Sequence, residues 1–202
     1  FGLHPAKSSG QIFVDGKEQQ LRSPADAIAA GIALVPEDRK LQGLILGQSV
    51  NNNIGITVLR QLQRWGMMLD NRKEVMLATE FINRLGIKTA SGNNAVRNLS
   101  GGNQQKIVIA KWLATKPQIL LLDEPTRGID INATTEIYGL MKQLVAEGIG
   151  VIMVSSELPE ILAISDRVLV ICEGTLTATL PVGTTSEQEI LKYAIHKNEL
   201  LQ

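Results

Sequence analysis

Two adjacent carboxylates follow an apolar run in the second half of the chain. Residues 119–122 (Ile-Leu-Leu-Leu) have the pattern of a buried strand, and Asp123 and Glu124 come directly after it. Ligands of open parallel sheets bind at the carboxyl ends of the strands. Asp123 could hold Mg²⁺ directly or through a water, and Glu124, expected on the opposite side of the pleat, could accept a proton from an attacking water. A solvated strand end is the alternative interpretation.

A hydroxyl and two glycines stand where a helix is predicted to begin. Ser100, Gly101 and Gly102 are followed by Asn103 and a helical pattern. The unpaired N–H groups at such a helix start carry partial positive charge and bind phosphate. Alone, the pattern is more typical of an ordinary serine N-cap after a turn. The two carboxylates shortly downstream favour the phosphate-binding interpretation.

Alternating helix and strand patterns would hold these groups in place. Residues 103–115 and 131–147 have helical periodicity, and residues 119–122 and 151–154 are apolar strands. A strand–helix–strand unit of this kind predicts parallel strands that are buried on both faces.

The flanking segments predict an antiparallel edge sheet, a helical lobe and a closing helix. Turn and capping residues locate the elements as follows: a hairpin at Asp15-Gly16, a helix from Pro24 capped by Ser23 and ending at Gly31, a strand over Ile32–Val35, a helix from Asn71 to Gly86 with Val75, Ala78, Ile82 and Leu85 on one face, a hairpin at Glu173-Gly174, and a last helix with a Ser186/Glu189 capping box. We therefore divide the chain into residues 1–49 (edge sheet and start of the core), 50–98 (helical lobe), 99–182 (core) and 183–202 (closing helix).

Bulk composition is that of an ordinary globular protein. Hydrophobic residues make up 44% of the chain, and 20 basic residues balance 20 acidic ones. No net field attracts nucleic acid, so any polyanion must be held by a local site. No apolar run reaches the roughly 18 residues that cross a bilayer, which predicts a cytosolic chain or one that docks on a membrane partner. Cys172, the single cysteine, is expected in the core.

Four sequence motifs resemble those of one family. LSGGNQQK at residues 99–106 is similar to the signature of ATP-binding-cassette (ABC) proteins, ILLLDEP at residues 119–125 to their Walker B strand, and Gly128-Ile129-Asp130 to their D-loop. VPEDRK at residues 35–40 matches the second cassette of tandem-cassette subunits in sugar-type importers. The resemblance implies an α/β fold of the ABC-type P-loop NTPase class, with a parallel core sheet, antiparallel edge strands and an inserted α-helical lobe.

The resemblance also implies cofactors and partners. ATP and Mg²⁺ would be used, with Asp123 near the metal and Glu124 as catalytic base. Cassettes of the family pair head to tail, so Ser100, Gly101, Gly102 and Asn103 would face ATP held by a partner cassette, with Asp130 nearby. Transmembrane permease subunits, and indirectly a periplasmic substrate-binding protein, would be further partners at the cytoplasmic face of a bacterial inner membrane.

The chain also departs from the family pattern. The Walker A motif GxxxxGK[ST] occurs nowhere in it, and Phe1-Gly2-Leu3 resembles the end of the helix that follows that motif, so we expect an N-terminal truncation and no activity of the chain alone. Glu37 stands at the family's Q-loop glutamine and Ser156 at its switch histidine. Two alternatives stay open: a fragment that only docks on partners, and a soluble cassette ATPase of DNA repair or translation, although heptads and a basic stripe are absent.

Overall fold

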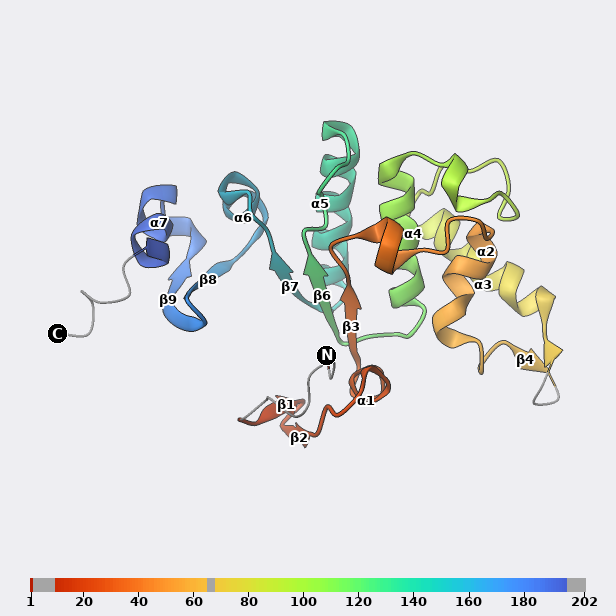
Figure 1. The fold of residues 1–202 in the computed structure, drawn as a ribbon, viewed down its shortest axis with the longest axis horizontal. Coiled ribbons are helices and arrows are strands. Elements are labelled where there is room, and N and C mark those ends of the chain that lie inside the picture. The colour runs from red at the N-terminus through yellow and green to blue at the C-terminus, as the bar shows by residue number, and fades with distance from the viewer. Residues whose placement is uncertain (2–9, 65–67, 196–202) are drawn as a thin grey trace. The chain divides into compact units, whose positions relative to one another are not determined.

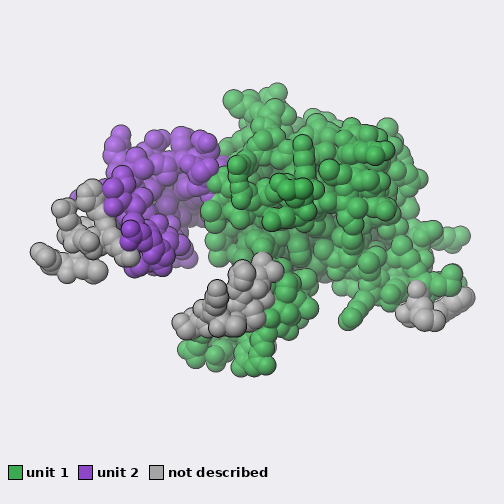
Figure 2. All heavy atoms as spheres, viewed as in Figure 1, with its two compact units in different colours: residues 1–154 green, residues 155–202 purple. Residues whose placement is uncertain are grey.

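The computed structural model describes residue 1, residues 10–64 and residues 68–195. These residues belong to two compact units, residues 1–154 and residues 155–202 (Figure 2). The expectation for Phe1-Gly2-Leu3 falls mostly outside the described residues. The four-part division given above stays a prediction.

Three parallel strands form the centre of the first unit (Figure 1). They are β3 (Ile32–Val35), β6 (Ile119–Asp123) and β7 (Gly150–Val154), and β6 lies between the other two. Val35 is level with Leu122, and Asp123 with Val154, so the three strands end together. This arrangement confirms the predicted parallel core.

Alternate residues of β6 enter two different cores. Leu120 and Leu122 are buried, as are Ile107 of α4 (Gly101–Leu113) and Ile137 of α5 (Ile131–Ala146). Ile119 and Leu121 instead pack against a cluster of Val14, Ala27 and Ile32. The period-2 alternation of a strand explains why neighbouring residues serve opposite faces.

The prediction of strands buried on both faces is wrong for β7. Ile152 and Val154 are 53% and 59% exposed, because β7 is an edge strand of this sheet and one of its faces has little cover among the described residues. The hydrogen bonds between β6 and β7 satisfy backbone groups of β7, but they do not cover its side chains.

The helical lobe contains a helix whose buried face agrees with the prediction at Ala78 and Leu85 and differs from it at Val75. The lobe comprises α2 (Val50–Gly55), η3 (Ile56–Val58), the short strands β4 (Gln63–Arg64) and β5 (Met68–Leu69), and α3 (Asn71–Arg84). On α3 and just after it, Glu74, Ala78, Phe81 and Leu85 are buried, whereas Val75 is 46% exposed. The i, i+4 and i, i+3 spacing of this set also makes one helical face, and packing against α2 selected it over the set containing Val75.

Most predicted turns and caps are confirmed. Ser23 accepts a hydrogen bond from Asp26 N at the start of α1 (Pro24–Ala29), and Asp15 and Gly16 have positive φ between β1 (Ile12–Val14) and β2 (Lys17–Gln19). Sequence patterns missed η2 (Arg39–Gly43), a single π-type turn, α6 (Leu158–Ile164) and the antiparallel pair β4–β5 in the helical lobe. η4 (Val96–Asn98) leads into α4.

The second unit is a hairpin with helices. It contains α6, β8 (Arg167–Cys172), β9 (Thr175–Pro181), η5 (Val182–Thr184) and α7 (Glu187–Ile195). Val168, Val170 and Ile190 form its small core, and Cys172 is buried as expected. In the parts of both units that the structure describes, none of the helices has the length and apolar character needed to span a bilayer.

Lys111 of α4 is a buried cation with an unusual titration. Its ammonium group donates a hydrogen bond to the Gly43 carbonyl and lies 5.4 Å from the centre of the Trp112 ring. Burial lowers the pKa of Lys111 from 10.5 to about 8. The unfolded chain therefore binds more protons between pH 8 and 10.5, and stability must rise with pH in that window.

We expect the free energy of unfolding to rise by up to about 3 kcal/mol between pH 8 and 10.5 through Lys111, since each pKa unit is worth about 1.4 kcal/mol. Lys111→Met should remove this increase. The exposed Lys142 of α5 provides the matched control, Lys142→Met, which should keep it. Urea unfolding of the three proteins at several pH values measures the slopes, and parallel slopes for Lys111→Met and the parent would contradict the assignment.

Candidate functional site

Asp123 and Glu124, at the end of β6, have different backbone conformations. Asp123 is the last residue of β6 and pairs with Val154. Glu124 has a φ of +46°, and its N–H donates to the Val154 carbonyl over 2.9 Å. The extended strand ends at Asp123 and Glu124 is left-handed, so the regular pleat does not continue to Glu124, and the side on which its carboxylate lies stays a prediction. A left-handed non-glycine residue is costly, and such residues gather at functional sites.

The donor set at this strand end suits Mg²⁺ bound together with phosphate. The described residues contain no cluster of three or more metal-binding side chains. Mg²⁺ is commonly held by one or two carboxylates, with substrate phosphates and waters as its remaining ligands. Asp123, which is half-buried, fits that limited protein contribution, and the half-buried Glu124 beside it is left free for the water.

The hydroxyl of Ser100 is not used as a helix cap. Ser100 occupies the N-cap position of α4 but makes no capping hydrogen bond. Its hydroxyl oxygen accepts instead from Nδ2 of Asn103 over 2.9 Å, and Oδ1 of Asn103 accepts from Lys88 N over 2.7 Å. A hydroxyl that accepts one bond still has its own hydrogen to donate. The ordinary-cap interpretation of Ser100 therefore fails, and Asn103 orients the hydroxyl.

The two glycines after Ser100 allow close packing. A Cβ at Gly101 would lie 2.8 Å from Nη2 of Arg39 and 3.3 Å from the Gly128 carbonyl oxygen, and one at Gly102 would overlap Cβ of Ala133. The start of α4 thus lies directly against residue 128 and the first turn of α5. The two glycines therefore have a packing role.

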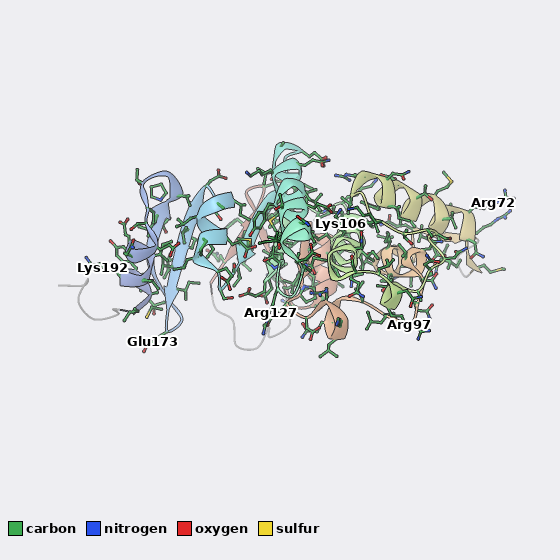
Figure 3. All side chains as sticks on the ribbon, turned by 90° about the horizontal axis from the view of Figure 1, so that it is seen from above. Arg72, Arg97, Lys106, Arg127, Glu173 and Lys192 are labelled. Atoms are coloured by element: carbon green, nitrogen blue, oxygen red, sulfur yellow. The ribbon has the colours of Figure 1, made fainter. Side chains whose placement is uncertain are left out.

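The segment between β6 and α5 is held from several directions. Asp130 caps α5 by accepting from Ala133 N over 2.9 Å. Glu37 forms an exposed ion pair with Arg127 (labelled in Figure 3), and such pairs contribute up to about 1 kcal/mol. The structure therefore joins Glu37 to the region of Asp130. Ser156 is exposed and belongs to the second unit.

A buried lysine of α4 joins this helix to the loop at Gly86 and to α5. Lys106, labelled in Figure 3, donates to the Gly86 carbonyl over 3.0 Å and pairs with Glu136 of α5 at 2.7 Å. Hydrogen bonds from Lys106 and then from Lys88 lower the pKa of the Glu136 carboxyl. Sequence reasoning missed Lys106, although it occurs inside the LSGGNQQK motif, and left Arg39 open as a residue that touches phosphate or a partner or is solvated.

The fold is that of ATP-binding cassettes. A nucleotide-free ATP-binding cassette from an ABC transporter superposes with a TM-score of 0.73 at 20% identity, over 92% of this chain and 73% of that chain. The cassette cbiO1 from Clostridium perfringens superposes with a TM-score of 0.71 at 25% identity, over 92% and 71% of the two chains. Both confirm the predicted fold class.

Sequence comparison defines the family. The ABC transporter family model matches residues 2–127, and the chain belongs to this family. It is 51% identical over 195 residues to the ribose import ATP-binding protein RbsA of Rhodopirellula baltica, and 46% identical over 194 residues to the xylose import ATP-binding protein XylG of Moorella thermoacetica. Each alignment covers 96% of this chain and 38% of the relative, so the chain spans well under half the length of either protein.

Proposed function

We propose that this chain is the second nucleotide-binding cassette of the ATP-binding subunit of a bacterial sugar-type ABC importer. The observation that carries the proposal is the Ser100 hydroxyl, which is oriented by Asn103, unused as a cap, and set at a glycine-lined helix start. The similarity to proteins named as ribose and xylose import ATP-binding proteins supports it.

In this proposal the residues form two half-sites. Ser100, Gly101 and Gly102 face ATP held by a partner cassette, and Asn103 acts through Ser100. Asp123 holds Mg²⁺, which would neutralise charge on the transferred phosphate, and Glu124 accepts a proton from the attacking water. Asp130 supports the interface with the partner cassette, and Glu37 holds the segment between β6 and α5 through its ion pair with Arg127. Ser156 donates a hydrogen bond at the position where the family has a histidine.

The proposed partners are a second cassette, transmembrane permease subunits and, indirectly, a periplasmic substrate-binding protein. The subunit would act as a peripheral protein at the cytoplasmic face of the inner membrane. Overall sequence resemblance points to autoinducer-2 as the solute, while the relatives carry the names of ribose and xylose importers. No role in nucleic-acid binding is proposed, because the charges balance.

Reconstitution tests this function. The full-length protein with its permease subunits in lipid vesicles should hydrolyse ATP faster when the solute-loaded binding protein is present, and should accumulate that solute. Autoinducer-2, ribose and xylose should be compared side by side. Hydrolysis that none of the three stimulates, with no uptake, would contradict an importer of this class.

A second candidate is a docking role without catalysis, because Glu37 and Ser156 stand where the family has its Q-loop glutamine and its switch histidine. Steady-state ATPase activity measured with and without an intact partner cassette separates the two roles. Turnover that appears only with the partner and depends on Glu124 supports catalysis, whereas no turnover attributable to this cassette supports docking.

The 202-residue chain alone should bind Mg·ATP weakly. Each charge-assisted hydrogen bond to phosphate contributes about 1.5–3 kcal/mol, and about 1.4 kcal/mol is tenfold in affinity, so lacking several such bonds should weaken binding by orders of magnitude. Calorimetric titration of this chain beside a cassette with Walker A measures the difference. A micromolar dissociation constant for the chain alone would refute this prediction.

A further inference from the structure

One arginine bridges three segments that carry family motifs. Arg39 donates from Nη1 to the Arg127 carbonyl over 2.7 Å and from Nη2 to the Gly128 carbonyl over 2.8 Å. The two carbonyls belong to consecutive residues, so the planar fork of one guanidinium fits both at once. A lysine at this position offers a single point charge and cannot reproduce this pair of bonds.

The same guanidinium lies against the start of α4. Nη2 would be 2.8 Å from a Cβ at Gly101, and the Gly128 carbonyl oxygen 3.3 Å from it. Any larger residue at Gly101 must displace the end of the Arg39 side chain. Arg39 is therefore enclosed between the helix that begins after Ser100 and the segment that leads to Asp130.

The backbone that carries Arg39 is itself anchored. Arg39 opens the π-type turn η2, where Oδ1 of Asp38 accepts from Lys40 N and Leu41 N over 2.8 Å and 3.0 Å. A Cβ at Gly43, the end of this turn, would be 3.0 Å from a methyl group of Val108 in α4. The turn thus sits closely on α4, and π-type turns are frequent at functional sites.

The arrangement is not one that stability alone would select. Nε of Arg39 is buried and has no hydrogen-bond partner among the described residues. A cation beside the first residue of α4 also opposes the positive end of the helix dipole. The position of Arg39 is therefore better explained by the segments that its guanidinium holds together than by the stability of α4.

We propose that Arg39 is a positioning residue that ties the carbonyls of Arg127 and Gly128 to the start of α4. This contact keeps Ser100 and Asp130 in a fixed position relative to each other when they face the nucleotide held by the partner cassette. The part of this inference that concerns nucleotide rests on the proposed function, whereas the structural tie can be measured without any ATP turnover.

The test uses the full-length protein with Arg39→Met and Arg39→Lys. Lys40→Met serves as matched control, because Lys40 is the neighbouring exposed cation of the same turn. Hydrogen exchange should become faster in residues 126–130 and 100–103 in both Arg39 variants and stay unchanged in Lys40→Met. Turnover should fall about tenfold in Arg39→Met with the KM for Mg·ATP changed less than about threefold, because Arg39 touches no nucleotide.

Gly101→Ala provides an independent variant that displaces the guanidinium without removing it. If Gly101→Ala and Arg39→Met break the same tie, the double variant should exchange no faster than the more affected single variant. Additive effects would overturn the proposal. So would unchanged exchange in Arg39→Met, or faster exchange spread over the whole sheet, which would indicate a general folding role. A parent protein without ATP turnover would refute the proposed function alone, since the exchange comparison still decides the tie.

Discussion

Glu124→Gln in the full-length protein is expected to lower the turnover of this cassette's own site by about 10²–10⁴-fold, the range typical of a lost general base. ATP binding should stay nearly unchanged, because the amide is isosteric and the phosphate and metal contacts do not depend on the proton acceptor. Single-turnover hydrolysis measures the rate of the chemical step, and an equilibrium titration with nucleotide measures the affinity for ATP. A loss of binding as large as the loss of turnover would make Glu124 a ligand or a structural group.

Two further variants sharpen that result. Asp123→Asn should raise the Mg²⁺ concentration needed for half-maximal turnover, which separates the metal-holding role from that of Glu124. Glu18→Gln on the exposed strand β2 is the control and should change neither quantity. The left-handed φ of Glu124 adds a stability readout, since Glu124→Gly should abolish turnover while stabilising the fold by about 1 kcal/mol.

Ser100→Arg should abolish ATP-dependent association with a hydrolysis-deficient partner cassette. The arginine would fill the space proposed for the γ-phosphate and remove the hydroxyl donor that Asn103 orients. Thermal stability should hardly change, because Ser100 makes no capping hydrogen bond. Sedimentation with and without ATP measures the association, and thermal unfolding measures the stability.

Ser23→Arg is the matched control, because Ser23 does cap its helix. It should cost about 1 kcal/mol of stability and leave association intact, which is the reverse of the Ser100 result. If Ser100→Arg still associates in the presence of ATP, the signature segment does not face nucleotide and the proposal for it is wrong.

The sequence by itself determined the elements whose signals are local. Asp15-Gly16, Ser23-Pro24 and Glu173-Gly174 each marked a turn or helix start correctly, because turn and cap chemistry depends on residues within a few positions. The apolar runs of β6 and β7, separated by a helical pattern, indicated parallel strands, and the apolar run of β3 indicated a short buried strand. The motifs indicated the family before any contact was known.

Tertiary structure decided every feature that depends on a distant partner. The buried face of α3 contains Glu74 and Phe81, because α2 packs there, and periodicity alone allowed either set. Ser100 was predicted as a cap or a ligand from its position, but only the contact with Asn103 showed that its hydroxyl is not a cap. The bonds of Arg39 to Arg127 and Gly128 span 88 and 89 positions, and no sequence pattern encodes a hydrogen bond to a carbonyl so far along the chain. Local backbone preference can be read from neighbouring residues, whereas a side chain's partner is fixed only when the packed helices and strands bring separate segments together.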